Sequence, residues 1–187
     1  MPQSFEGSNM YREILRFWFE EIEPAQWWKK DDGFDKSILV RFSDIHASAT
    51  RCELFEWRKS DRGRLAEIIV LDQFSRNMFR GSPLSFAQDP LALALAQEAV
   101  SARADETLCP EERNFLFMPF MHSESLKIHE VAMDLFRNKG TQSGLEFEIK
   151  HKRIIERFGR YPHRNGVLGR QSTAEEIEFL KQPGSGF

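Results

Sequence analysis

Hydrophobic residues recur at intervals of three and four along most of the chain, the spacing of one face of an α-helix. Runs alternating with a period of two, which would indicate strands, are absent, and short connectors favour antiparallel neighbours. The sequence therefore predicts an all-α array of antiparallel helices. The predicted helices cover residues 11–22, 34–57, 64–77, 91–103, 110–121, 124–139, 145–158 and 174–180.

Several helix ends carry recognisable start signals. Asp89 and Pro90 suit the cap and the first position of a helix, and Ser123 suits another cap. Thr173 and Glu176 have the spacing of a capping box. Pro119 is expected to kink or end the helix that contains it.

Charged residues occupy the apolar face of helix 64–77. The stripe formed by its leucine and isoleucines continues onto Asp72 and Arg76, which are four residues apart and can pair. We expect both side chains to be largely buried, with Arg76 contacting an acidic group. The pair could fix helix packing or form the polar floor of a cleft.

Three histidines also lie on core-facing stripes: His122, His129 and His151. A lone histidine on an apolar face is usually a hydrogen-bonded core residue, and three of them together with Asp72 and Arg76 raise the alternative of a shared polar site. His46 lies beside its stripe and is predicted to be a surface or rim histidine.

The segment 158–170 combines three glycines and a proline with three arginines and a histidine. Glycine and proline fix an unusual backbone path, from which Arg160, His163, Arg164 and Asn165 can offer donors in several directions. We interpret it as a shaped polar loop. It is expected to lie against His122 and the end of helix 64–77, forming a positively charged cleft.

Composition limits the class of protein. The chain has 187 residues and seventeen phenylalanines against two tyrosines, which favours one packed helical domain, 1–187, with a frayed tail at 182–187. The net charge of −3 argues against a nucleic-acid partner. Residues 145–170 nevertheless carry seven basic and three acidic side chains. This local positive charge indicates either a solvated helix face or an anion site.

Targeting and cofactor signals are absent from the sequence. Cys52 and Cys109 lie outside any metal or redox spacing, and neither a signal peptide in residues 1–10 nor an apolar run long enough to span a bilayer is present. A cytoplasmic protein without membrane contact or cofactor is expected. Histidines and Glu124 could ligate a metal, but their spacing matches no zinc motif, so no metal is predicted.

Three blocks together resemble a known family. They are Leu71-Asp72-Gln73-Phe74-Ser75-Arg76-Asn77 with 79–81, Met118-Pro119-Phe120-Met121-His122-Ser123-Glu124, and Arg160-Tyr161-Pro162-His163-Arg164-Asn165 continuing through 168–173. The likeness, from about residue 11 to 180, is to a bacterial family of uncharacterised proteins with a tetratricopeptide-repeat-like all-helical fold. The resemblance implies a tetratricopeptide-repeat-like superhelix, but it brings no established activity. Ser75 stands where the family often has proline, which affects helix shape.

Two functional hypotheses remain beside a structural one. A binding protein would clamp a small anionic ligand or peptide with Arg76, Arg80, Arg160 and Arg164. A hydrolase or transferase would use His122, His151 or His163 as general base, oriented by Asp72 or Glu124. Alternatively, the polar blocks only lock the fold. Binding is favoured because no nucleophile or phosphate-binding motif is recognisable. The candidate binding residues are Asp72, Arg76, Asn77, Arg80, His122, Glu124, His151, Arg160, His163, Arg164 and Asn165.

Overall fold

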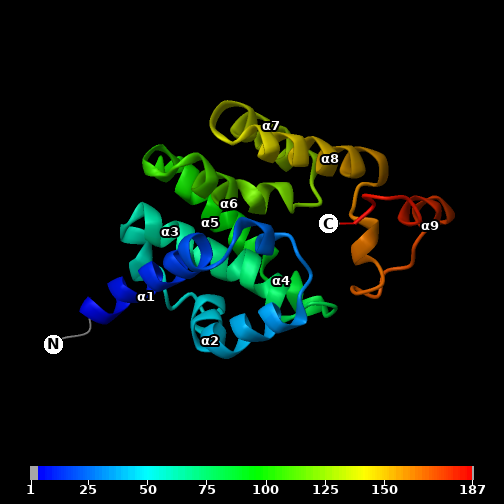
Figure 1. Ribbon diagram of the computed structural model, residues 1–187. Coiled ribbons are helices and arrows are strands. Elements are labelled where there is room, and N and C mark those ends of the chain that lie inside the picture. The colour runs from blue at the N-terminus through cyan, green and yellow to red at the C-terminus, as the bar shows by residue number, and fades with distance from the viewer. Residues whose placement is uncertain (1–3, 187) are drawn as a thin grey trace.

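The computed structural model describes residues 4–186, with side chains from Met10 onward, and this part of the chain is helical without any strand. Its α-helices are α1 Ser4–Arg16, α2 Asp32–Thr50, α3 Asp61–Ile69, α4 Ser75–Met78, α5 Asp89–Ser101, α6 Pro110–Met121, α7 Leu126–Lys139, α8 Gln142–Phe158 and α9 Ala174–Leu180 (Figure 1). The predicted all-α class is confirmed. The superhelix, the single domain and the frayed tail stay predictions, and residues 1–3 and 187 lie outside the described part.

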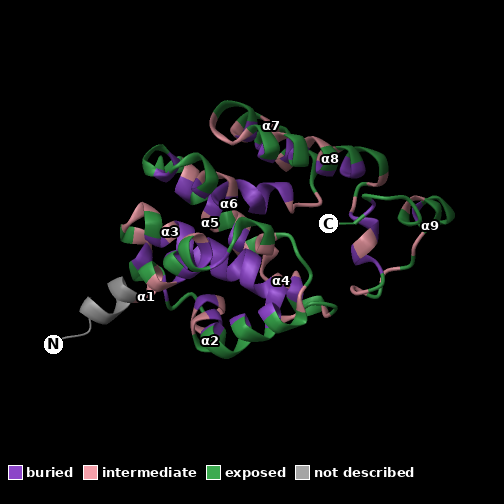
Figure 2. Cartoon of the chain, viewed as in Figure 1, coloured by how far each residue is buried: buried purple, intermediate pink, exposed green. Residues whose placement is uncertain are grey.

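The core is centred on α3, which packs against α1, α5 and α6. Every residue from Leu65 to Ser75 is buried, and Figure 2 shows this burial continuing through the middle of the molecule into α6. Fully burying one Leu, Ile or Phe side chain contributes about 1.5–3 kcal/mol. The apolar side chains of this buried segment therefore anchor the helix from which Asp72 and Arg76 project.

The C-terminal part has a smaller core of its own. Ile154, Ile155 and Tyr161 form a separate buried cluster, against which Phe158 and Phe179 pack. α8 packs along α7, and the chain then leaves α8 through a loop with a 3-10 turn, η7 Pro162–Arg164, before α9 (Figure 1). Gly159 ends α8 with φ of +67°, a left-handed conformation that glycine adopts without strain.

The predicted helix 34–57 is shorter in the structure. α2 begins at Asp32 and ends at Thr50, because Cys52 adopts a left-handed conformation with φ of +58° that stops the helix. A 3-10 turn, η3 Phe55–Lys59, follows. The prediction of a surface histidine is also wrong: His46 is buried, with its Nε2 2.8 Å from Ser75 Oγ.

The predicted helix 64–77 is interrupted by a π-helical turn, η4 Val70–Phe74, between α3 and α4. Ser75 Oγ donates to Leu71 O across this turn at 2.6 Å, a side-chain bond that bends helices. Such single π-turns are frequent at functional sites. Asp72 lies inside this one.

α6 ends at Met121 as predicted, and Pro119 lies inside it without ending it. Other helix boundaries differ from the predicted ones. α1 begins at Ser4, well before residue 11, and continues into a π-turn, η1 Phe17–Glu21. Ser123 is not the cap of α7, because Ser125 occupies that position while Ser123 Oγ accepts from its amide N–H at 3.2 Å. The capping box of Thr173 and Glu176 at α9 is confirmed.

Candidate functional site

Asp72 is the centre of a buried polar network. Its side chain is 1% exposed, Oδ1 lies 2.8 Å from His122 Nδ1 and 3.0 Å from Arg76 Nη1, and Oδ2 accepts from Gln73 Nε2 at 2.6 Å. Burial alone would raise the pKa of Asp72, but Arg76 and the hydrogen bond with His122 hold that pKa well below its usual range. Asp72 is therefore ionised, and the expected burial and acidic contact of Arg76 are confirmed.

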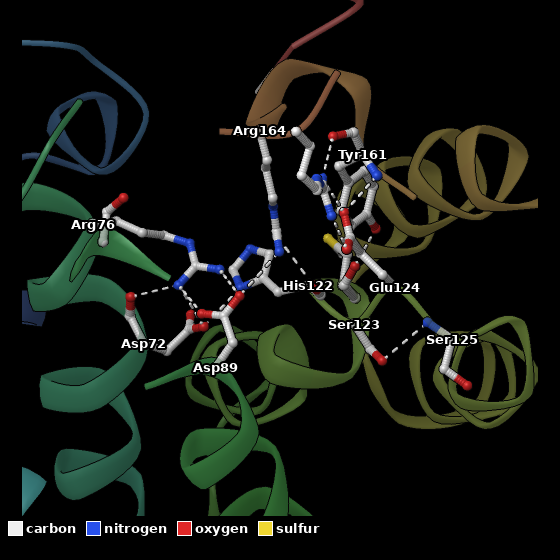
Figure 3. A network of polar contacts seen from close by, with 12 residues as sticks. Asp72, Arg76, Asp89, His122, Ser123, Glu124, Ser125, Tyr161 and Arg164 are labelled. Atoms are coloured by element: carbon white, nitrogen blue, oxygen red, sulfur yellow. Dashed lines mark hydrogen bonds and ion pairs between the residues drawn. The ribbon is translucent and has the colours of Figure 1, made fainter. Parts of the chain in front are cut away.

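Asp89 binds two arginines from different parts of the chain. Arg76 donates to both of its carboxylate oxygens, at 2.9 and 3.1 Å, and Arg164 Nη1 donates to Oδ2 at 3.1 Å. Figure 3 shows the two guanidinium groups approaching Asp89 from different sides, with His122 beside them. The sequence interpretation of Asp89 as a helix cap is wrong, because Gln88 occupies the cap position of α5.

Arg164 is held firmly although it comes from a loop. The residue is 6% exposed, its Nη2 donates to His122 O at 3.0 Å, and its Cζ lies 4.6 Å from the ring centroids of both Phe86 and Tyr161. Burial and the nearby Arg76 charge lower the pKa of Arg164. Its Nε is buried and has no hydrogen-bond partner within residues 10–186.

His122 has a defined tautomer. Because Nδ1 faces the ionised Asp72, Nδ1 carries the proton and Nε2 carries the lone pair. Nε2 has no hydrogen-bond partner in the part of the chain that the structure describes. Burial, followed by the charge of Arg76, lowers the pKa of His122, so the neutral imidazole predominates at neutral pH.

The segment that carries His122, Met121–Ser125, is fixed by buried groups from the C-terminal part. Tyr161 Oη donates to Met121 O at 2.5 Å, and His129 Nε2 donates to Ser123 O at 2.8 Å. Glu124 accepts from Tyr161 N at 2.7 Å and from both terminal nitrogens of Arg170 at 2.6 and 2.9 Å. The loop and the α6 end therefore hold each other in place.

A pocket of about 350 Å³ opens beside this network. Its polar side is formed by Asp89, His122, Ser123, Glu124 and Arg164. Its other lining residues are apolar: Pro83, Phe86, Ala87, Pro90, Leu93, Pro119 and Leu168. This combination suits a ligand that has one polar group and an apolar body.

The other predicted site residues divide into two groups. His151 lies near the pocket, its ring centroid 6.3 Å from that of His122, and its Nδ1 donates to Phe147 O at 2.8 Å. The ring of His163 lies 5.5 Å from that of Tyr161, and burial together with Arg164 lowers the pKa of His163 to about 4.

Three predicted residues have partners away from the pocket. Asn77 Nδ2 donates to Asp35 Oδ1 at 2.7 Å, and Arg80 donates to both carboxylate oxygens of Asp35, at 2.5 and 2.9 Å. Arg160 pairs with Glu176 at 2.6 and 2.8 Å, so it does not lie with Arg164.

Asn165 stabilises the loop itself, since its Nδ2 donates to Ser172 Oγ at 3.0 Å and its Oδ1 accepts from Arg170 at 2.9 Å. Of the predicted binding residues, His122, Glu124 and Arg164 line the pocket, and the binding cleft itself stays a prediction. Its expected positive charge is offset, because Asp72 and Asp89 balance Arg76 and Arg164.

Within the described residues, histidines, cysteines and carboxylates do not gather into a group of three or more that could hold a metal ion. The helices in that part are also too short or too polar to cross a membrane.

Comparison with known proteins places the chain in a family. The model of a family described as "Bacterial protein of unknown function (DUF924)" matches residues 14–184. The chain belongs to this family. A solved structure described as a protein of unknown function, ATU0120 from Agrobacterium tumefaciens, is 38% identical, with a TM-score of 0.88 over 93% of this chain and 98% of that one. The comparison with curated proteins gave no match.

Proposed function

We propose that the pocket beside Arg164 binds a small molecule with a carboxylate group and a short apolar chain. The observation that carries this proposal is the incomplete pairing of Arg164. A guanidinium has five N–H donors, and only two hydrogen bonds from Arg164 to described residues are formed, one to Asp89 and one to His122 O. Asp89 is itself shared with Arg76.

The surroundings of Arg164 favour a carboxylate over other anions. Arginine pairs with carboxylates through two parallel hydrogen bonds, and the flanking rings of Phe86 and Tyr161 hold the guanidinium in one orientation. Because the two aspartates already balance the two arginines, the site has no excess positive charge to neutralise a multiply charged anion. A singly charged ligand is therefore the better match.

The size and lining of the pocket favour a small molecule over a peptide. Its volume of about 350 Å³ is at the low end of the range for small-molecule sites, roughly 300–1,000 Å³. Phe86, Leu93 and Leu168 form the apolar wall of the pocket. Each buried CH₂ of an aliphatic chain would add about 0.8 kcal/mol to binding.

Thermal denaturation with acetate, butyrate, hexanoate and hexanol tests the proposal. A ligand that binds only the folded protein raises the melting temperature, so hexanoate should raise it most and hexanol least. The rise should shrink with increasing salt. In Arg164→Gln we expect no rise, whereas Arg160→Gln, a loop arginine paired with Glu176, should respond like the parent.

If Arg164→Gln fails to fold, Leu93→Trp provides a second variant, because the larger ring fills the pocket. A hexanoate response in a folded Leu93→Trp protein, or equal responses in Arg164→Gln and the parent, would contradict the proposal.

A further inference from the structure

We propose that His122 is a general base that activates water in this pocket to hydrolyse a small carboxylic ester with an apolar chain. The inference rests on the proposed function, since the acid product of the reaction is the carboxylate that Arg164 would hold. It assigns chemistry to His122 that binding alone does not require.

The geometry of His122 is that of a base. Asp72 accepts the Nδ1–H at 2.8 Å and is itself fixed by Arg76 and Gln73, so the ring has one orientation. The lone pair of Nε2 is left without a hydrogen-bond partner within the described residues, and His122 is one of the residues that line the pocket. His129 differs, because both of its ring nitrogens are bonded, to Glu148 and to Ser123 O.

The charges around His122 set its proton affinity. Asp72 and Arg76 face it from η4 and α4, Asp89 from α5, His151 from α8, and His163 and Arg164 from the loop. Burial and Arg76 lower the pKa of His122, which keeps Nε2 free to accept a proton at neutral pH. Once it is protonated, the imidazolium is stabilised by Asp72 beside Nδ1.

The reaction balances without a co-reactant. Nε2 of His122 takes a proton from water as the water oxygen bonds to the ester carbonyl carbon, and the carbonyl π electrons move onto oxygen. An N–H of Arg164 can donate to that oxyanion from the same pocket. The intermediate then expels the alkoxide, which takes the proton from Nε2, giving an alcohol and a carboxylic acid that ionises in solvent.

An uncharged ester also matches the electrostatics of the pocket. The two arginines and two aspartates cancel in formal charge, so a neutral substrate enters without charge repulsion. The apolar wall of Phe86, Leu93 and Leu168 would bind the acyl chain.

The test measures release of p-nitrophenol from p-nitrophenyl acetate, butyrate, hexanoate and octanoate by the purified protein. We expect turnover in the parent and in Arg160→Gln, and a kcat at least about 100-fold lower in His122→Gln, the usual contribution of a general base. The acid limb of kcat/KM should lie below pH ~6.5, the ordinary pKa of histidine. Hexanoate should still raise the melting temperature of His122→Gln, because Arg164 is intact.

Asp72 is a positioning residue in this proposal. Asp72→Asn should lower kcat and move the acid limb to lower pH, because the imidazolium loses its anionic partner. A packing defect would not move that limb.

Other outcomes overturn the inference. If hexanoate raises the melting temperature but the parent hydrolyses none of the esters, catalysis is wrong and binding stands. Turnover without a hexanoate response contradicts the binding proposal alone. An equal kcat in His122→Gln excludes His122 as base, and loss of turnover in Ser123→Ala would show that serine rather than water is the nucleophile.

Discussion

Replacing Asp72 with alanine tests whether the network contributes to the stability of the fold. The substitution removes the acceptor of Arg76, His122 and Gln73 at once, from a position that is 1% exposed. Breaking a buried ion pair by removing one partner costs about 3–5 kcal/mol. Because Arg76 keeps its two bonds to Asp89 and is 19% exposed, we expect the low end of that range, about 3 kcal/mol.

Urea unfolding followed by circular dichroism measures this loss. With m of about 2–3 kcal/mol per molar urea, a loss of about 3 kcal/mol lowers the midpoint by roughly 1 M or more. The matched control is Asp134→Ala, which removes an ion pair with Arg137 whose side chains are 73% and 56% exposed. Exposed pairs of this kind contribute about 0.2–1 kcal/mol. Equal midpoint shifts in the two variants would refute the assignment of Asp72 to a buried network.

Two further outcomes concern stability. The pKa of Asp72 is lower in the folded protein than in the unfolded chain. The stabilisation that ionised Asp72 gives the folded state is therefore complete above the unfolded pKa of ~3.9, and it is lost as pH falls through the lower pKa of the folded state. The difference in unfolding free energy between the parent and Asp72→Asn should therefore be constant above pH ~5 and shrink in acid; a gap that grows in acid would contradict this. Gly63→Ala would place a Cβ 2.1 Å from Trp57 O, whereas Gly166→Ala meets nothing within 4 Å. We expect a loss of about 1–3 kcal/mol or more for the first and a near-parent melting temperature for the second.

Helical spacing was sufficient to predict the class of fold and the inward direction of the key polar groups. Asp72 and His122 were recognised because each continues an apolar stripe, and both are largely buried in the structure. Arg164 was recognised because its loop carries more charge than a connector needs. These signals are local, and local periodicity is the information that a single sequence displays most directly.

The partners of the remaining residues depend on contacts between distant segments. Arg80 and Asn77 bind Asp35, which lies more than forty residues earlier in the chain. The spacing of residues within a helix cannot predict a contact between such distant positions. Asp89 was misassigned because aspartate before proline is a good helix start, and the same carboxylate serves better as an acceptor for arginine. The π-turn at η4 was missed because it inserts one residue into an otherwise regular helical pattern.

The way the arginines are paired distinguishes a ligand site from a structural lock. Elsewhere in the described chain, two buried carboxylates each take one arginine through two hydrogen bonds: Glu67 takes Arg58, and Glu176 takes Arg160. A network that served only to fix the fold could use the same one-to-one arrangement. Beside the pocket, Asp89 serves both Arg76 and Arg164, and Asp72 serves both Arg76 and His122. This sharing leaves N–H donors on Arg164 without an acceptor among the described residues, which supports the proposal that the network binds a ligand.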